Sequence, residues 1–434
     1  MMSRSALSFL TGVAALLVIP TAQAATEIRV ACYSDGNECE ATQALLPKFE
    51  QDHPDIKVVI DKQAYKAILE SLPVQLAAGH GPDIARTTDF GIISQYFLDL
   101  RPLLKDAAFW DANYGATLAW LRSDPGDKGI YGLPTQLTVS APFINKTLFD
   151  QANAAIPGPR ATWDDWAKAT QAVAKATQVP FAMAWDRSGH RFSGPAISEG
   201  AKYFTADGTP AVIDEPFKAL ARRFIQWHQD GTMPKEVWGG QGGGGYRDAF
   251  EEFANGQIVL YLTGSWQVAR MEKQIGDAFE WQVVSNPCGP AACTGMPGGA
   301  QFVAFKQTQH PKEVAAFLDF LASEPVYAEW MAMTSNIPAN TALQKKQIAY
   351  RLSPAGSAAM NTFSQQGAEI APLAYRLQGY RYNRVMLVPI ADRLGQAVTG
   401  RSSAPGPDPS RTYTTKQSCG SLCMAEPSSE MGRG

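Results

Sequence analysis

The sequence predicts an α/β protein with two cores. Short apolar runs alternate with amphipathic segments, which is the pattern of strands joined by helices in a mostly parallel sheet. This pattern occurs once near the N-terminus and a second time further along the chain. The length of 434 residues exceeds the roughly 100 to 200 residues of a common domain, so two α/β units are expected rather than one.

The first α/β set lies within the first ninety residues. Strands are predicted at residues 27–33, 56–60 and 82–88, and helices at 41–51 and 64–79. Pro73 interrupts the second helix. Because proline lacks the amide proton and clashes with the preceding turn, it should kink or divide that helix.

The second set begins with a helix at residues 162–176, where Thr162 and Asp165 have the spacing of a capping box. A short amphipathic helix at 247–256 precedes an apolar run, Ile258 to Leu262. That run has apolar residues on both faces, as a central strand requires. A further helix starts at Pro311, a residue suited to the first helical turn.

The N-terminus has the pattern of a secretory signal peptide, assigned to residues 1–24. Arg4 precedes an apolar run, and Ala22-Gln23-Ala24 is the small-x-small pattern that signal peptidase cuts. No later stretch approaches the roughly 18 to 20 apolar residues of a membrane span. The absence of a cysteine at the cleavage site argues against a lipid anchor, so we expect a protein free in the periplasm.

Six cysteines in an exported chain favour disulfides, because the compartment is oxidising. Cys32 and Cys39 bracket one short loop, and Cys288 and Cys293 bracket another. Each pair could close its loop, but the sequence does not fix the connectivity. The other two cysteines lie in the tail at residues 402–434, which has the Ser-, Pro- and Gly-rich composition of a disordered segment.

Composition and motifs exclude several functions. The net charge of −3 indicates no basic surface and no nucleic-acid partner. There is no GxSxG or HExxH motif, and the glycine-rich segment 239–245 lacks the Lys-Ser/Thr of a phosphate-binding loop, so it is interpreted as a flexible surface loop. We expect no enzymatic activity, no metal and no cofactor. A glycoside hydrolase with carboxylates from distant segments stays open as an alternative.

Aromatic and polar residues gather instead at the ends of predicted strands, as a sugar-binding site requires. Trp185 could stack on a ligand ring and Asp186 could accept ligand hydroxyls, while Trp266 ends the segment "NGQIVLYLTGSW". Burial in the core is the open alternative for both tryptophans. Asp35 follows the first strand in "YSDGNE", where it could contact ligand or simply form a turn.

Several ordered segments resemble the extracellular solute-binding proteins of ABC importers, the family that includes maltose-binding and glycerol-3-phosphate-binding proteins. The likeness is carried by "LLPKFEQDHPDIKV", "AAGHGPDI", "IYGLPTQLTVSAPFINKTLFDQA", "ATWDDWAKATQAV", "FANGQIVLYLTGSW" and "GMPGGAQFVAFKQTQHPKEVAAFLDFLASEP". It extends over nearly the whole mature chain to about Arg401. The resemblance implies a two-lobed periplasmic-binding-protein fold of the α/β class, with a hinge of crossing strands and a ligand cleft between the lobes.

The resemblance also implies domain boundaries. Lobe 1 would comprise residues 25–137 and 263–310, and lobe 2 residues 138–262 and 311–401. The chain would cross between lobes near residues 137–142, 258–264 and 306–311. Gly264 would then let the backbone approach the ligand, and Trp266 would reach the cleft wall or plug the space under the hinge.

The glycerol-3-phosphate-binding branch is similar enough to imply individual roles. Its phosphate-binding arginine corresponds to Arg384, whose planar guanidinium suits an oxyanion. Its cleft tyrosine, acid and hydroxyl residue correspond to Tyr65, Asp89 and Thr138, and its Gly-Gly pair falls on Gly298 and Gly299.

This chain departs from that branch at two places. Asn336 replaces a tyrosine, and Gly264-Ser265 with Trp266 replaces a serine pair. The loss of polar contacts and the gain of an indole shift the expected ligand toward a sugar or polyol.

The expected function is therefore that of a monomeric periplasmic receptor that delivers a carbohydrate or polyol to the transmembrane permease subunits of an ABC importer. A receptor for sn-glycerol 3-phosphate or glycerophosphodiesters is the alternative within the class, because Arg384 keeps an anionic ligand open. A bridge between Cys32 and Cys39 would stiffen the loop that carries Asp35 and so preorganise one wall of the cleft.

Overall fold

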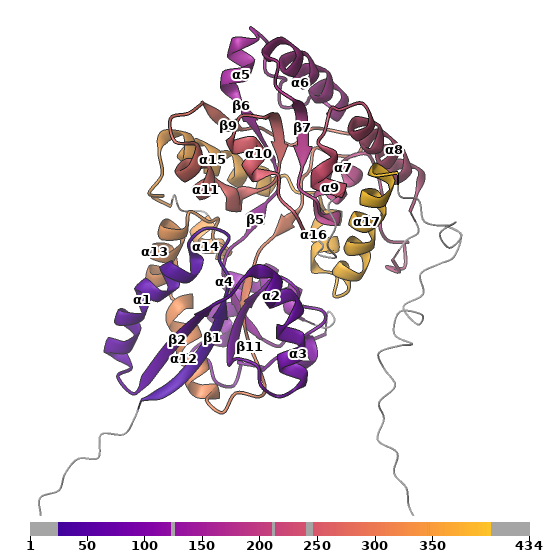
Figure 1. Ribbon diagram of the computed structural model, residues 1–434. Coiled ribbons are helices and arrows are strands. Elements are labelled where there is room, and N and C mark those ends of the chain that lie inside the picture. The colour runs from indigo at the N-terminus through magenta and orange to yellow at the C-terminus, as the bar shows by residue number, and fades with distance from the viewer. Residues whose placement is uncertain are drawn as a thin grey trace, which may run out of the picture.

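A computed structural model describes residues 25–122, 126–210, 213–239, 246–344, 346 and 348–400. The predicted signal peptide, the tail at 402–434 and all of the glycine-rich segment except Gly239 lie outside these residues. The described part of the chain forms two α/β lobes, one above the other in Figure 1. None of its helices has both the length and the apolar character needed to cross a membrane.

Lobe 1 is built on a five-stranded sheet in the order β2-β1-β3-β11-β4. Its strands are β1 (Thr26–Cys32), β2 (Ile56–Lys62), β3 (Ile84–Thr87), β4 (Gly132–Pro134) and β11 (Gln301–Ala304). β1 pairs in parallel with β2 and β3, whereas β11 runs antiparallel to β3 and β4.

The helices of lobe 1 lie on both sides of this sheet. They are α1 (Glu38–Asp52), α2 (Tyr65–Glu70), α3 (Leu72–Ala77), η1 (Ser94–Tyr96), α4 (Ala107–Leu118), η2 (Ala119–Leu121), α12 (Pro311–Ala322), α13 (Glu324–Thr334) and α14 (Thr341–Gln344). Phe49, Phe302 and Trp330 belong to the core under α1, α12 and α13. The predicted helix at 64–79 is divided into α2 and α3, with Pro73 in the first turn of α3.

Lobe 2 is built on a four-stranded sheet in the order β7-β8-β6-β9. Its strands are β6 (Pro142–Asn145), β7 (Phe181–Trp185), β8 (Ile258–Leu262) and β9 (Trp281–Val283). All five residues of β8 are buried, which confirms the prediction of a central strand. In each sheet one strand runs against the others, β11 in lobe 1 and β6 in lobe 2, so both sheets are mixed while most of their strands run in one direction, as predicted.

The helices of lobe 2 include those at the C-terminus. They are α5 (Lys146–Gln151), α6 (Trp163–Thr177), α7 (Gly189–Ser198), α8 (Glu215–Gln229), α9 (Lys235–Gly239), α10 (Phe250–Ala254), η3 (Ser265–Gln267), α11 (Val268–Ile275), α15 (Pro354–Ala368), α16 (Pro372–Gly379) and α17 (Asn383–Val398). The capping box predicted from Thr162 and Asp165 is present at the start of α6.

The lobes are joined by crossing strands. β5 (Thr138–Val139) and β10 (Pro297–Gly298) pair antiparallel between the two sheets. Leu137 also forms an isolated bridge with Ile337, which lies between α13 and α14. The first crossing lies where it was expected.

The other two expected crossings, and with them the predicted lobe boundaries, are wrong. β8 pairs with strands on both sides inside the lobe 2 sheet, and β9 follows it there, so the chain returns to lobe 1 only at β10. The apolar stripe of α12 packs in the lobe 1 core, so residues 311–334 belong to lobe 1. The third crossing comes between α14 and α15. A strand's place in a sheet depends on its partners, which its own apolar pattern does not specify.

Two disulfides are present, with the local pairing that the spacing allows. Cys32–Cys39 joins the end of β1 to the first turn of α1. Cys288–Cys293 closes a short loop between β9 and β10, and this loop hydrogen-bonds to the C-terminal end of α7 through Ser198.

Candidate functional site

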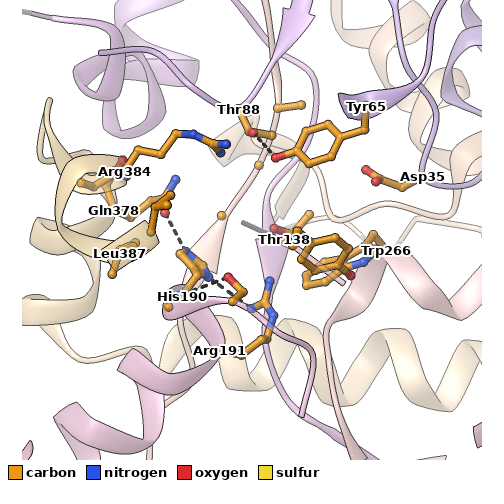
Figure 2. A pocket seen from close by; sticks show the side chains of 18 of the residues that line it. Asp35, Tyr65, Thr88, Thr138, His190, Arg191, Trp266, Gln378, Arg384 and Leu387 are labelled. Atoms are coloured by element: carbon orange, nitrogen blue, oxygen red, sulfur yellow. Dashed lines mark hydrogen bonds between the residues drawn. The ribbon is translucent and has the colours of Figure 1, made fainter. Parts of the chain in front are cut away.

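A cleft of about 180 Å³ lies between the lobes, beside the crossing strands β5 and β10 (Figure 2). Both lobes and the hinge contribute side chains to it. Its walls are formed by Tyr33, Asp35, Tyr65, Thr88, Gln136, Thr138, Ser188, Gly189, His190, Arg191, Tyr246, Trp266, Gly298, Gly299, Ala300, Gln378, Asn383, Arg384, Leu387 and Val388.

Two tyrosines form the aromatic part of the lobe 1 wall. Tyr33 begins the connection from β1 to α1, and Tyr65 is the first residue of α2, at the end of the connection from β2. Their ring centroids are 4.8 Å apart. The Tyr65 hydroxyl is 2.8 Å from the Thr88 hydroxyl, which fixes the ring toward the cleft.

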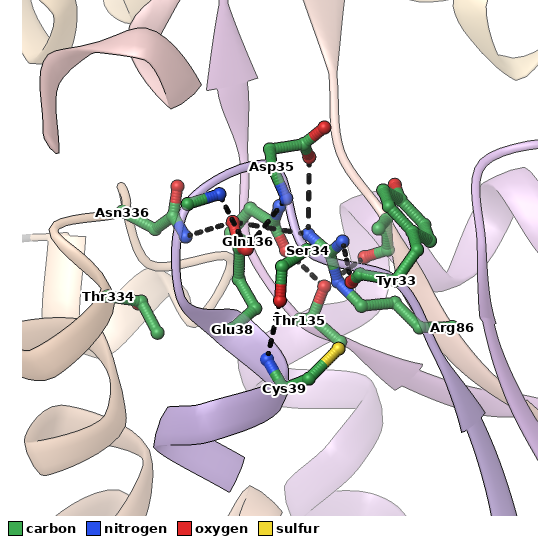
Figure 3. A network of polar contacts seen from close by, with 12 residues as sticks. Tyr33, Ser34, Asp35, Glu38, Cys39, Arg86, Thr135, Gln136, Thr334 and Asn336 are labelled. Carbon is green, nitrogen blue, oxygen red and sulfur yellow. Dashed lines mark hydrogen bonds and ion pairs between the residues drawn. The ribbon is translucent and has the colours of Figure 1, made fainter. Parts of the chain in front are cut away.

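Asp35 is held at the cleft by a network of charges behind it (Figure 3). Arg86 is fully buried, lies over the Tyr33 ring at 4.2 Å, and places Nη2 3.6 Å from Asp35 Oδ2 and 3.5 Å from Glu38 Oε1. Burial, with the nearby charge of Glu38, raises the pKa of Asp35 to about 6. Asp35 is therefore a cleft acceptor that is fully ionised only above that pH.

Glycines let the hinge strands form the floor of the cleft. Gly299 has a φ of +154°, and a Cβ there would lie 2.2 Å from the Gln136 carbonyl oxygen, so only glycine fits. A Cβ at Gly298 would lie 2.7 Å from the Thr138 hydroxyl. The backbone of the second crossing therefore approaches the first without side chains between them.

The first turn of α7 forms much of the lobe 2 wall. Ser188 caps the helix by accepting a hydrogen bond from the His190 amide. His190 Nε2 lies 2.7 Å from Gln378 Oε1 of α16. Burial, together with the positive charge of Arg191, lowers the pKa of His190 to about 3, so the imidazole is neutral at physiological pH.

Arg191 lies against Trp266 on the same wall. Its guanidinium carbon is 4.4 Å from the indole centroid, and Nη1 donates to the Ser140 hydroxyl. Burial lowers the pKa of Arg191, while the negative charge of Asp186 opposes this effect. Arg191 thus covers part of the Trp266 ring.

Arg384 joins the two lobes across the cleft. It lies in the first turn of α17, and its Nε is 3.0 Å from Asp89 Oδ2 in the loop after β3. Asp89 is not itself part of the cleft lining.

Seven of the predicted binding residues line the cleft: Asp35, Tyr65, Thr138, Trp266, Gly298, Gly299 and Arg384. The other five, Asp89, Trp185, Asp186, Gly264 and Asn336, do not.

Trp185 is fully buried in the core of lobe 2, which corrects its interpretation as a stacking residue. Its ring centroid lies 4.6 Å from that of Trp163 and 5.3 Å from that of Phe224. Because successive side chains of β7 point to opposite faces, the ring at the end of this strand projects into the helical layer and away from the ligand space.

Asp186 is also fully buried, so it does not accept ligand hydroxyls. Its carboxylate accepts hydrogen bonds from the hydroxyls of Tyr246, Tyr261 and Thr263 and from the Ala249 amide. Tyr246 lines the cleft, so Asp186 positions a cleft residue from behind.

Gly264 and Asn336 likewise act from behind the wall. A Cβ at Gly264 would lie 2.0 Å from the Trp266 ring, so this glycine makes room for the indole and does not itself approach the ligand. Asn336 is buried, and its Nδ2 lies 3.3 Å from Glu38 Oε1. It supports the Asp35 network drawn in Figure 3.

Several cleft residues that were not predicted lie close in sequence to residues that were. Ser188, His190 and Arg191 come directly after Asp186, in a segment already singled out as a strand end. Gln378 and Asn383 lie in the Tyr- and Arg-rich segment that contains Arg384. Gln136 and Tyr246 carry no signal in the sequence, because the fold alone brings them to the cleft.

A family model described as "Bacterial extracellular solute-binding protein" matches residues 44–354. Among curated proteins, the multiple sugar-binding protein of Streptococcus mutans is 24% identical over 317 residues, covering 68% of this chain and 71% of that protein. The sn-glycerol-3-phosphate-binding periplasmic protein of Pectobacterium atrosepticum is 26% identical over 365 residues, covering 79% of this chain and 80% of that protein.

Solved structures show the same fold. An ABC substrate-binding protein of Listeria monocytogenes in complex with cycloalternan superposes with a TM-score of 0.73, at 19% identity over 87% of this chain and 95% of that chain. The GacH receptor of Streptomyces glaucescens, solved unliganded and with acarbose, gives a TM-score of 0.69 at 19% identity, covering 86% of this chain and 94% of that chain.

Proposed function

We propose that this chain, which belongs to the family of bacterial extracellular solute-binding proteins, is the receptor of an ABC importer and captures a carbohydrate or polyol in the interlobe cleft. The name of one relative, a multiple sugar-binding protein, supports this class of ligand. The receptor acts in the periplasm after removal of a signal peptide, as a monomer, and delivers its ligand to transmembrane permease subunits.

The observation that carries the proposal is the chemistry of the cleft. Rings of Tyr33, Tyr65, Tyr246 and Trp266 line it together with side-chain amides and hydroxyls from both lobes. Sugars present apolar ring faces to aromatic planes and hydroxyls that both donate and accept hydrogen bonds. A site of this composition suits a polyhydroxylated ligand.

The carboxylates favour binding over hydrolysis. A glycoside hydrolase of the usual kind needs two carboxyl groups around the scissile bond. Among the described residues that line the cleft, Asp35 supplies a carboxylate and no second Asp or Glu accompanies it. Asp89, the nearby acid, is paired with Arg384. The chain is therefore proposed to bind its ligand without catalysis.

A receptor for sn-glycerol 3-phosphate or a glycerophosphodiester is the second candidate. It is favoured by two guanidinium groups at the cleft, Arg191 and Arg384, because arginine binds phosphate through two parallel hydrogen bonds.

The test is a thermal-shift screen of the mature protein against monosaccharides, disaccharides, polyols, glycerol 3-phosphate and its diesters. A ligand at 100 times its dissociation constant stabilises the folded state by about 2.7 kcal/mol, which raises the melting temperature measurably. Trp266→Ala should abolish the shift. Tyr382→Ala is the control, since Tyr382 is 44% exposed and lies outside the cleft lining.

Two results would contradict the proposal. One is the absence of a shift with every compound in a folded preparation. The other is sustained turnover of a bound glycoside by the pure protein.

A further inference from the structure

Three arginines are buried in the described part of the chain, and one of them has no carboxylate partner. Arg86 lies 3.5 Å and 3.6 Å from two carboxylates, and Arg187 lies 2.6 Å from a third, that of Asp392. Arg191 is only 7% exposed, yet no described Asp or Glu forms an ion pair with it. Because a buried charge without a counter-charge is costly, the position of Arg191 calls for an anion from outside these residues.

One nitrogen of the Arg191 guanidinium is held by neighbouring side chains. Nη1 donates to the Ser140 hydroxyl and lies 3.2 Å from His190 Nδ1. The imidazole of His190 is neutral at physiological pH, and its Nε2 lies 2.7 Å from Gln378 Oε1. Nε2 therefore carries the proton, and Nδ1 accepts a hydrogen bond from Arg191. These contacts fix the plane of the guanidinium.

The edge formed by Nε and Nη2 of Arg191 has no partner. Nε is buried and makes no hydrogen bond, and no described residue bonds to Nη2. On this edge the two N–H groups are parallel, which is the arrangement that binds two oxygens of a carboxylate or a phosphate. Arg191 lines the cleft, and its side chain points from α7 toward Thr138 and Trp266 (Figure 2).

The surroundings of Arg191 also favour an anion. Ser188, Gly189 and His190 line the cleft at the N-terminus of α7, a helix of ten residues. This end of a helix carries the positive end of its dipole.

Two carboxylates near Arg191 already have other partners. Asp186 accepts hydrogen bonds from three hydroxyls and one amide. Asp35 also lines the cleft, but it belongs to lobe 1 and forms an ion pair with Arg86. Neither acid is therefore the counter-ion of Arg191.

We propose that Arg191 binds an anionic group of the ligand through Nε and Nη2, and that the cleft takes an acidic sugar. The sugar ring contacts Trp266, and its carboxylate or phosphate lies at the N-terminus of α7. This inference rests on the proposed function, because it names the ligand class of the same cleft. Arg191, a residue to which the family resemblance assigns no role, is then a specificity-determining residue on the lobe 2 wall.

The test is isothermal titration of the full mature chain at pH 7 with glucuronate, glucose 6-phosphate and glucose. Glucose has the same ring as the two acids and no anionic group. Wild type should bind at least one of the acids about tenfold or more tightly than glucose, as expected for hydrogen bonds to a charged group. This ratio needs no variant, so it tests the ligand class directly.

Variants of Arg191 test the residue. Arg191→Gln removes the charge and should abolish the preference for the acid over glucose, whereas Arg191→Lys keeps the charge without the planar fork and should retain part of it. The ratio of the two affinities is the readout, because a loss of support for the Trp266 ring weakens the binding of acid and glucose alike. Arg376→Gln is the matched control: Arg376 lies over Phe204 at 4.5 Å, outside the cleft lining, so the ratio should not change.

The two acids distinguish the source of the anion. A preference for glucuronate alone identifies a carboxylate, and a preference for glucose 6-phosphate alone identifies a phosphate. Either result supports the inference if Arg191→Gln removes the preference.

Three results would overturn the inference. The first is binding of glucose at least as tightly as both acids, which leaves the receptor function standing. The second is a preference for an acid that survives Arg191→Gln and is lost in Arg384→Gln, because the anion would then lie on Arg384. The third is binding of none of the three compounds by folded wild type, in which case the wider thermal-shift screen decides separately whether the chain is a receptor.

Discussion

The guanidinium of Arg191 lies over the indole of Trp266, with its central carbon 4.4 Å from the ring centroid. A cation above an aromatic face is attracted by the ring quadrupole, and the attraction grows when the pair is desolvated. One face of the ring is therefore covered, so a sugar must stack on the other face or contact the ring edge. The hydrogen bond from Arg191 to Ser140 ties this pair to the first hinge crossing.

Replacing Arg191 with alanine should weaken ligand binding about tenfold, because Trp266 loses the group that fixes its orientation. The measurement is titration calorimetry with the compound that gives the largest thermal shift. Arg376→Ala is the matched control, since Arg376 lies over Phe204 at 4.5 Å but outside the cleft lining. Equal affinities for wild type and Arg191→Ala would show that Trp266 needs no such support.

Asp186→Asn should destabilise the protein by about 2 to 4 kcal/mol. The carboxylate accepts hydrogen bonds from four donors, three hydroxyls and one amide. An asparagine would turn an amide group toward some of these donors and leave buried polar groups unsatisfied. Urea denaturation measures the loss.

Substitution of two tyrosines distinguishes the contribution of Asp186 to stability from its contribution to positioning Tyr246. Tyr261→Phe removes a buried donor and should lower stability by about 1 kcal/mol without changing affinity. Tyr246→Phe removes the donor that lines the cleft, and should lower affinity. If both variants bind ligand as wild type does, Asp186 serves stability alone.

The sequence was sufficient to predict the α/β class, the helix interrupted at Pro73 and the central strand at Ile258–Leu262, because these follow from local patterns. It did not predict the second and third crossings. Whether the chain leaves a lobe after β8 depends on β6 and β7 pairing with that strand, and residues 142–145 and 181–185 are distant from it in sequence.

In the candidate site, too, some residues were predictable from the sequence and others depend on the fold. Tyr65 and Arg384 follow from the family resemblance and Asp35 from its position after the first strand, and all three line the cleft. Trp185 does not line the cleft. Its chemistry suggested a stacking role, but the alternation of side chains along β7 decides whether the last ring of the strand faces the ligand, and that alternation directs it into the core. Tyr246 lines the cleft and donates a hydrogen bond to Asp186, which is 60 residues away in sequence.

Lowering the pH should reduce the stability of the folded protein through protonation of His190. Its pKa is lowered to about 3 in the folded protein from about 6.5 when unfolded. The unfolded chain therefore binds a proton first, and the stability contributed by neutral His190 is present above about pH 6.5 and falls as the pH drops. Urea denaturation at pH 7 and pH 5 should show a smaller acid loss in His190→Gln than in wild type.

Asp35 should change the folding stability in the opposite direction over the same pH range. Its pKa is raised to about 6 in the folded protein from about 3.9 when unfolded. Its protonated form contributes stability that is present at low pH and lost as the pH rises through 6. Asp35→Asn removes this compensation, so its stability should fall more steeply than that of wild type between pH 7 and pH 5. Parallel pH profiles for the two proteins would contradict this assignment.

Removing the Cys32–Cys39 bridge should affect both stability and binding. The bridge closes a loop with a sequence separation of 7, and loss of such a constraint costs roughly 2 to 3 kcal/mol in the chain-entropy model. The loop contains Tyr33 and Asp35, which both line the cleft. A looser loop must be ordered when the ligand binds, so the affinity of a Cys32→Ser, Cys39→Ser protein should fall as well.

The second disulfide separates these two effects. Cys288–Cys293 closes a loop of similar size beside the C-terminal end of α7, and neither cysteine lines the cleft. A Cys288→Ser, Cys293→Ser protein should therefore lose comparable stability while its affinity changes little. Calorimetric titration of both variants, at a temperature where each is fully folded, shows whether the loss of affinity is specific to the Cys32–Cys39 bridge. Wild-type affinity in the Cys32→Ser, Cys39→Ser protein would show that the charge network of Arg86 and Glu38 holds Asp35 in place without the bridge.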